Sequence, residues 1–127
     1  MSRIITWSKV LVRLLLAAGM VAAGTYHFLH PEPFVRIVPA FLPAPLLLVH
    51  VSGVFEILFG LALWVPRLRW YAAWGLVLLF LAVFPANINM AVNHIQLDPA
   101  QPLPDWVAWV RLPFQLLFIG GAYFVRK

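Results

Sequence analysis

The chain has 127 residues, of which 64% are hydrophobic and only 10% are charged. A soluble domain carries about 25% charged residues, so this composition indicates an integral membrane protein and excludes a soluble catalytic or nucleotide-binding domain. The chain has no cysteine, which excludes disulfides, thiol redox chemistry, Fe–S clusters and thiolate metal sites.

Four segments are long and apolar enough to cross a bilayer, which takes about 20 residues of helix. They are residues 10–29, 46–65, 70–92 and 106–125, and together they account for most of the chain. We therefore predict a single transmembrane domain over residues 1–127, an all-α integral membrane antiparallel four-helix bundle.

The first predicted helix, residues 10–29, carries small and polar side chains on one face. Gly19, Ala23 and His27 follow one another at intervals of four residues, so they share this face. Small residues let another helix approach closely, and we expect a partner helix on this face. Arg13 lies near the inner end, from where its long side chain can reach the membrane interface.

The segment between the first two helices, residues 30–45, holds five of the chain's eleven prolines. Phe34, Ile37 and Phe41, together with Arg36, indicate a short amphipathic piece that lies in the interface. This piece is either a lid over the outer end of the bundle or only a stiff connector, and the sequence leaves both open.

Glu56 is the most informative residue, because it is the only acid inside an apolar segment. An aspartate at the centre of a membrane helix costs about 2.5–3.5 kcal/mol on insertion scales, so an acid at that depth needs a partner, a proton or water. The residues on its helix face by three- and four-residue spacing are Val49, Ser52 or Gly53, and Gly60. Glu56 is therefore expected to project from a small-residue face that packs on protein and not on lipid.

The last two predicted helices add further polar groups, and each contains a proline. Pro85 frees one backbone carbonyl inside the membrane, which nearby polar groups or water must satisfy. Asn87 follows on the same helix. Arg111 and Gln115 share one face of the last helix, with Pro113 between them.

The basic residues predict the topology. Seven of the nine lie on one side of the membrane when both termini share that side with the loop at 66–69. These seven are Arg3, Lys9, Arg13, Arg67, Arg69, Arg126 and Lys127. The positive-inside rule makes this side, and so both the N and the C terminus, cytoplasmic. A signal peptide cleaved near residues 20–24 is an alternative, but it would leave three spans and weaken the charge pattern. Since topology explains the net charge of +5, we expect no nucleic-acid partner.

The polar side chains gather in the outer half of the predicted bundle. At about 1.5 Å per residue, Asn87 and Arg111 lie about 8 Å from the outer helix ends and Glu56 lies about 15 Å from them. The candidate site residues are His27, Glu56, Asn87, Arg111 and Gln115. We predict an outward-opening polar pocket with a Glu56–Arg111 ion pair at its floor, suited to a quinone head group or a small anion. The alternative is a self-satisfied network that only fixes helix packing.

Two histidines raise the alternative of a haem. His27 and His50 belong to different helices near one interface, as two axial ligands would require. We expect no acid beside either histidine, and the sequence has no recognised ligand motif, so we predict no metal site.

Four motifs carry a family resemblance: GTYHF at 24–28, SGVFE at 52–56, FPANI at 84–88 and RLPFQ at 111–115. With them the chain resembles the DoxX-like family of small bacterial membrane proteins over nearly its whole length. The resemblance implies a four-helix protein of the bacterial inner membrane, with the family's polar positions at His27, Glu56, Asn87 and Arg111. Some members of that family are subunits linked to thiosulfate:quinone oxidoreduction, and others are associated with methylamine utilisation or membrane oxidoreductase complexes.

The polar cluster and the resemblance together predict a subunit or accessory of a membrane oxidoreductase system, with quinone as its candidate cofactor. The expected partners are the lipid bilayer, membrane or periplasmic oxidoreductase subunits, and a second copy of the chain. Two alternatives remain open. One is a structural or assembly protein without a ligand, and the other is a small-solute transporter, against which the apolar cytoplasmic half argues.

Overall fold

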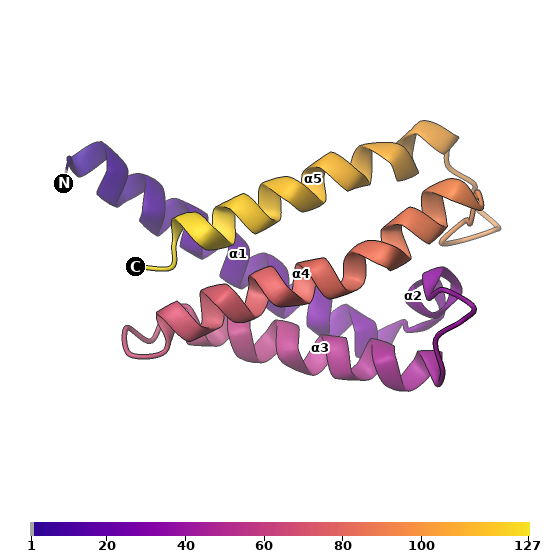
Figure 1. Cartoon of the computed structure of the whole chain (residues 1–127), viewed down its shortest axis with the longest axis horizontal. Helices are drawn as coiled ribbons and strands as arrows, with labels where there is room; N and C mark the ends of the chain where they lie inside the picture. Colours follow the sequence, from indigo (N-terminus) through magenta and orange to yellow (C-terminus); the bar gives the residue numbers. More distant parts are fainter. Residues whose placement is uncertain (1) are drawn as a thin grey trace.

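In the computed structural model, which describes residues 2–127, all the regular secondary structure is helical (Figure 1). The helices are α1 (Arg3–Leu29), α2 (Glu32–Ile37), α3 (Pro45–Ala62), α4 (Arg69–Val92) and α5 (Asp105–Phe124). Within these residues, the four helices α1, α3, α4 and α5 are long and apolar enough to cross a membrane. The predicted all-α class is confirmed, and the predicted helix ends agree within three residues except at the start of α1.

Helix α1 begins at Arg3, well before the apolar run that predicted a start at residue 10. The side chain of Ser2 accepts a hydrogen bond of 3.2 Å from the backbone N–H of Ile5, which caps the helix. Arg and Lys are good helix formers, so the charges that interrupt the apolar pattern do not interrupt the helix. The first turns of α1 project past the other helices (Figure 1).

The four long helices form two closely packed pairs. Helix α1 packs mainly against α3, and α4 packs mainly against α5, while the contacts between the pairs are fewer. Successive long helices run in opposite directions, and both termini lie at one end, which we call the terminal end (Figure 1). The opposite end, where α2 lies between the two pairs, is called the α2 end. Toward it the pairs spread apart.

An apolar core closes the space between the pairs at the terminal end. Leu63, Ala73, Leu76, Ala122 and Val125 have no exposed surface. They come from α4, α5 and the residues that follow α3 and α5, with Leu16 of α1 completing the cluster. Because this core is dense, the two pairs are fixed together at this end.

Helix α2 is fastened to the α2 end by packing and by two hydrogen bonds. Ile37 is buried against a cluster that includes Met90 and Ala108. Asn89 Nδ2 donates to the carbonyl of Ile37 at 2.9 Å, and Arg36 Nη1 donates to the carbonyl of Leu97 at 2.6 Å. The predicted short piece in this segment is therefore a helix, and it ties α4 and the following loop to α2.

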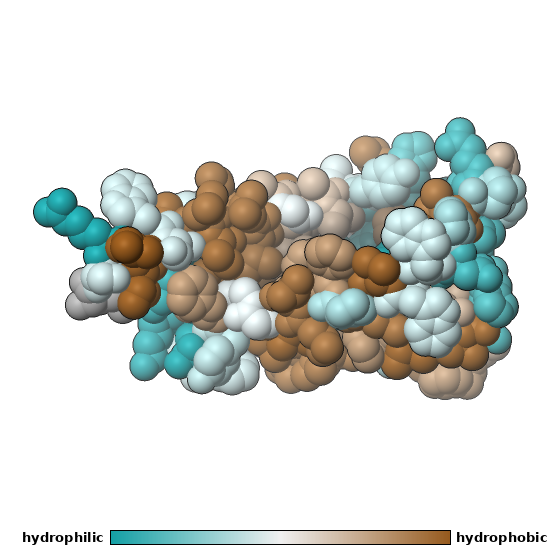
Figure 2. All heavy atoms as spheres, turned by 90° about the horizontal axis from the view of Figure 1, so that it is seen from above, coloured by the Kyte–Doolittle hydropathy of each residue, from teal (hydrophilic) through white to brown (hydrophobic). Residues whose placement is uncertain are grey.

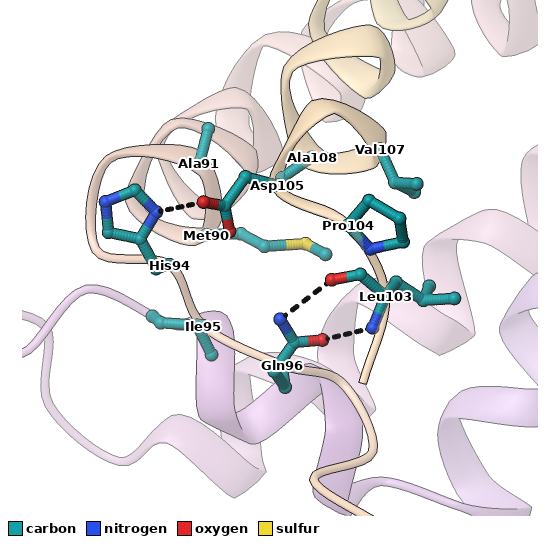
Figure 3. Close-up of a pocket in the computed structure, with 10 residues that line it drawn as sticks. All are labelled: Met90, Ala91, His94, Ile95, Gln96, Leu103, Pro104, Asp105, Val107 and Ala108. Atoms are coloured by element: carbon teal, nitrogen blue, oxygen red, sulfur yellow. Dashed lines mark hydrogen bonds and ion pairs between the residues drawn. The ribbon is translucent and has the colours of Figure 1, made fainter. Parts of the chain in front are cut away.

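The loop between α4 and α5 is clasped across its base (Figure 3). The side chain of Gln96 pairs with the backbone of Leu103, accepting at 2.8 Å and donating at 3.1 Å. His94 Nδ1 lies 3.4 Å from Asp105 Oδ2, and both side chains are exposed. This clasp holds the start of α5 beside the end of α4.

The outer surface of the bundle is apolar in its middle. Figure 2 shows hydrophobic residues over the central part of one face, with hydrophilic residues gathered toward both ends. Exposed large hydrophobic residues occur on all four long helices, among them Leu15, Leu58, Leu78 and Leu117. Such a band is what a lipid bilayer would cover.

Candidate ligand-binding site

The α1–α3 pair is joined by a close approach of two glycines. A Cβ on Gly24 would lie 2.6 Å from the carbonyl oxygen of Gly53, and a Cβ on Gly53 would lie 3.0 Å from that of Gly24. The predicted small-residue face of α3 is confirmed, since its buried residues are Val49, Gly53, Glu56 and Gly60. The predicted contact face of α1 is wrong at Gly19, which has open space where its Cβ would be.

This approach brings His27 of α1 and Glu56 of α3 together. Helical side chains lean toward the N-terminus of their own helix, and the two helices are antiparallel, so the two side chains lean toward each other. His27 Nδ1 lies 2.8 Å from Glu56 Oε2. The residues are only 8% and 7% exposed.

The His27–Glu56 contact has the distance of an ion pair without the alignment of a hydrogen bond. Neither Nδ1 nor Oε2 has a hydrogen-bond partner of good geometry among residues 2–127. A buried polar atom left in this state favours any partner that aligns better. The two side chains are therefore in close contact and still able to bind a further polar group.

The predicted ion pair between Glu56 and Arg111 is wrong. In the described part of the chain the two contacts between a basic side chain and a carboxylate are His27–Glu56 and His94–Asp105. Because α5 begins at the α2 end, the Arg111 side chain is expected to lean toward that end and away from Glu56. The half-buried guanidinium of Arg111 lines a cavity and has no carboxylate within ion-pair distance among residues 2–127.

The second polar group of the site joins α4 to α5. Asn87 Nδ2 donates to Gln115 Oε1 at 2.5 Å, and Gln115 Nε2 donates to the carbonyl of Phe80 at 2.8 Å. Both polar side chains are buried. Phe80 lies in the turn before Pro85, so Gln115 supplies a donor to the backbone where the proline disturbs the helix. This part of the network is satisfied within the protein.

A cavity of about 530 Å³ lies between the two helix pairs, and all five predicted site residues line it. His27 and Glu56 are on the wall formed by α1 and α3, and Asn87, Arg111 and Gln115 are on the wall formed by α4 and α5. The rest of the lining is mainly apolar and includes Met20, Leu79, Val83 and Phe118. A large apolar cavity with a few convergent polar groups has the size and composition of a small-molecule site.

Residues of α2 and of the loop after it line the cavity at the α2 end, where the sequence predicted its outer mouth. Phe34 and Ile37 of α2 and Leu42 of the following loop line it from that end. Phe34 packs edge-on against the His27 ring, with centroids 4.0 Å apart. Val51 and Phe55 of α3 line the cavity and are also exposed on the apolar surface. The opening is thus bordered by the lipid-like face of the bundle.

Two lining residues that bear directly on the His27–Glu56 pair, Ser52 and Phe34, were not among the predicted site residues. Ser52 lies one helical turn before Glu56, and its buried Oγ has no hydrogen-bond partner among residues 2–127. The four-residue spacing from Glu56 was a signal for it. The sequence identified Phe34 only as part of the amphipathic piece. Its contact with His27 could not be predicted, because that contact depends on how the proline-rich segment folds back.

The histidine geometry differs from the haem alternative. His50 stacks on Phe28, with centroids 5.1 Å apart and planes 11° apart. The expectation that no acid stands beside His27 is wrong, since Glu56 does. Residues 2–127 hold no group of three or more His, Cys, Asp or Glu side chains placed to bind a metal ion.

Comparison with known proteins gives one family. A family model described as a domain of unknown function, DUF8561, matches residues 16–126, which include all five site residues. No curated protein and no solved structure matches the chain. The resemblance to the DoxX-like family stays a prediction beside this match. Because the match covers most of its length, the chain belongs to the DUF8561 family.

Proposed function

We propose that the chain is a multi-pass protein of the bacterial inner membrane, related to the DoxX-like family, with both termini in the cytoplasm. The apolar band and the four long apolar helices support insertion. Seven of nine basic residues belong to the terminal end, which supports a cytoplasmic placement of that end. The α2 end and the cavity would then face the outer side.

We propose further that the cavity binds a quinone. The observation that carries this proposal is the composition of the cavity: about 530 Å³ of mainly apolar space with polar groups on two facing walls. A quinone head group is a flat apolar ring with a carbonyl acceptor at each end. Its tail is lipid-soluble, which suits an opening bordered by the exposed apolar residues Val51 and Phe55. A small anion would leave most of the apolar wall uncovered.

The two walls supply different groups to such a ring. Arg111 donates from a planar fork and has no carboxylate partner, so it suits one carbonyl oxygen. Ser52, with its unpartnered hydroxyl, and the His27–Glu56 pair stand on the other wall. We assign Asn87 and Gln115 to holding that wall in shape, because they already satisfy each other.

The protein would serve as a subunit or accessory of a membrane oxidoreductase system. Since the chain has no thiol, electrons for the quinone would come from a membrane or periplasmic partner subunit. A second copy of the chain is a further candidate partner.

A second candidate function is structural or assembly-related, without a ligand. The self-satisfied Asn87–Gln115–Phe80 network favours it, because such networks fix helix packing without any bound molecule. Two observations favour the quinone proposal instead. One is the cavity itself, and the other is that Arg111 lines it without an ion-pair partner among residues 2–127.

The test is native mass spectrometry and an optical spectrum of protein extracted gently with its own lipids. We expect a bound quinone in the natural chain and about tenfold less in Arg111→Met, a loss equivalent to about 1.4 kcal/mol. Arg13→Met is the control, because it removes an arginine of the membrane helices that does not line the cavity and is buried more deeply than Arg111. Protein that carries only ordinary lipids would refute the quinone proposal and favour the structural function.

A further inference from the structure

A second group of basic side chains lies at the terminal end, far from the cavity. Arg13 of α1 is only 7% exposed, and its buried Nε has no hydrogen-bond partner among residues 2–127. Its guanidinium lies over the Trp64 ring, 5.8 Å from the centroid. The sequence predicted that this side chain would reach the membrane interface, but the structure buries it between α1 and the end of α3. A buried arginine with unused donors needs an acceptor.

Arg69, the first residue of α4, lies close to this arginine. Its Nε donates to the carbonyl of Leu63 at 2.9 Å, next to Trp64. Lys9, one helical turn before Arg13, is half-buried with its Nζ 5.6 Å from the Phe124 ring centroid. Two helices therefore carry three cations at the terminal end, with Arg13 beside Trp64, Arg69 bonded to the neighbouring carbonyl, and Lys9 one turn before Arg13.

No acidic side chain among residues 2–127 forms an ion pair with these cations. The chain has four acids, which are Glu32, Glu56, Asp98 and Asp105. Glu56 is held by His27, and the other three lie in or beside the connections at the α2 end. Like charges that are brought together out of water destabilise the fold unless an anion joins them.

The positive-inside rule explains which side these residues occupy, but it does not explain the burial of Arg13. Exposed Arg3 would satisfy that rule equally well while keeping its donors in water. The position beside Arg69 and Trp64 instead forms a basic cluster next to an aromatic ring, at the level of the α3–α4 loop.

We propose that Lys9, Arg13 and Arg69 bind the phosphate group of an anionic membrane lipid. Arginine binds phosphate through paired N–H donors, and basic pockets between transmembrane helices on the cytoplasmic side bind anionic lipid head groups. Trp64 is 43% exposed, so its ring extends from the arginine to the apolar surface where an acyl chain would lie. The site is separate from the cavity and does not depend on the quinone proposal.

The test measures lipid binding by the full chain in zwitterionic micelles. Phosphatidylglycerol, phosphatidylcholine and inorganic phosphate are added in turn, and binding is followed by native mass spectrometry and by the melting temperature from tryptophan fluorescence. We expect phosphatidylglycerol alone to bind specifically and to raise the melting temperature. Equal effects of phosphatidylcholine, which carries a phosphate balanced by a choline cation, would overturn the selectivity for an anionic lipid, and equal effects of inorganic phosphate would overturn the lipid assignment.

Three variants locate the site. Arg13→Gln is expected to weaken phosphatidylglycerol binding about tenfold, because it removes the buried guanidinium and its paired N–H donors. Arg3→Gln, which removes the same charge from an exposed position on the same helix, is expected to change binding by less than about twofold. If Arg13→Gln fails to fold, Arg69→Gln replaces it, with a loss of about threefold or more expected. Equal losses in Arg3→Gln and in Arg13→Gln or Arg69→Gln would mean that the basic end attracts the lipid only through its overall charge. That result would overturn the proposal.

Discussion

Gly24 of α1 and Gly53 of α3 meet backbone to backbone, and this contact determines which residue lies beside Glu56. A Cβ on Gly24 would lie 2.6 Å from the carbonyl oxygen of Gly53. His27 and Glu56 each follow one of these glycines by three residues, and they lean toward each other from the two helices. The close crossing therefore leads directly to the 2.8 Å contact on the cavity wall.

Adding a methyl group at this crossing should destabilise the fold. Gly24→Ala is expected to lower the free energy of unfolding by about 1–3 kcal/mol, because the added Cβ meets backbone that cannot move aside cheaply. Gly19→Ala is the control on the same helix, since nothing lies within 4 Å of its added Cβ. It should be neutral or stabilising by up to about 1 kcal/mol. Melting temperatures in detergent measure both, and equal shifts would contradict the crossing.

His27 and Glu56 should be energetically coupled. Removing one partner leaves the other buried without compensation. The losses in free energy of unfolding of His27→Leu and Glu56→Leu should therefore add up to more than the loss in the double variant. A double-mutant cycle on the free energy of unfolding is expected to give a coupling of about 1–3 kcal/mol. The same cycle on Glu56 and Arg111 should give a value near zero. A larger coupling for Arg111 would restore the ion pair that the sequence predicted.

The sequence did not identify His27 as the partner of Glu56, and the reason is physical. Depth counted along the helices placed Arg111 within reach of Glu56, because its side chain is long. Arg111 was therefore predicted as the partner. Depth ignores the direction in which side chains lean, and direction reverses between antiparallel helices. It also ignores which helices pack together, and the Gly24–Gly53 contact decides that.

Gln115 should stabilise the α4–α5 pair through its two hydrogen bonds. Gln115→Leu is expected to cost about 1–2 kcal/mol, because it leaves Asn87 without its acceptor and removes the added hydrogen bond to the Phe80 carbonyl. Gln101→Leu, an exposed glutamine in the α4–α5 loop, is the control and should shift the unfolding free energy by less than about 0.5 kcal/mol. Thermal unfolding in detergent measures both. A stability of Gln115→Leu equal to that of the natural chain would contradict the network.

The proposed orientation can be tested by labelling single introduced cysteines, since the natural chain has none. Gln101→Cys in the α4–α5 loop should react with a membrane-impermeant maleimide added to intact spheroplasts. Leu68→Cys in the α3–α4 loop should react only after the membrane is opened, because the positive-inside rule places that loop in the cytoplasm. The opposite pattern of labelling would reverse the orientation.

The helices themselves were largely predictable, because apolar runs of membrane length have few alternatives. The early start of α1 was missed, since hydropathy fades at Lys9 and Arg3 while helix propensity does not. The grouping of the five site residues followed from their depth alone. The burial of Arg13 was missed, since it depends on Trp64 and the α3–α4 loop.

The central claim is that the space between the helix pairs is a ligand site, and filling that space tests it most directly. Ala23 of α1 lines the cavity one turn before His27, while its neighbour Ala22 is exposed and does not line it. The measurement is the dissociation constant of a short-tailed quinone, followed by quenching of tryptophan fluorescence in Ala23→Phe and in Ala22→Phe. We predict binding at least about tenfold weaker in Ala23→Phe and unchanged in Ala22→Phe, with both variants folded. Equal affinity in the two variants would contradict a quinone site in this cavity.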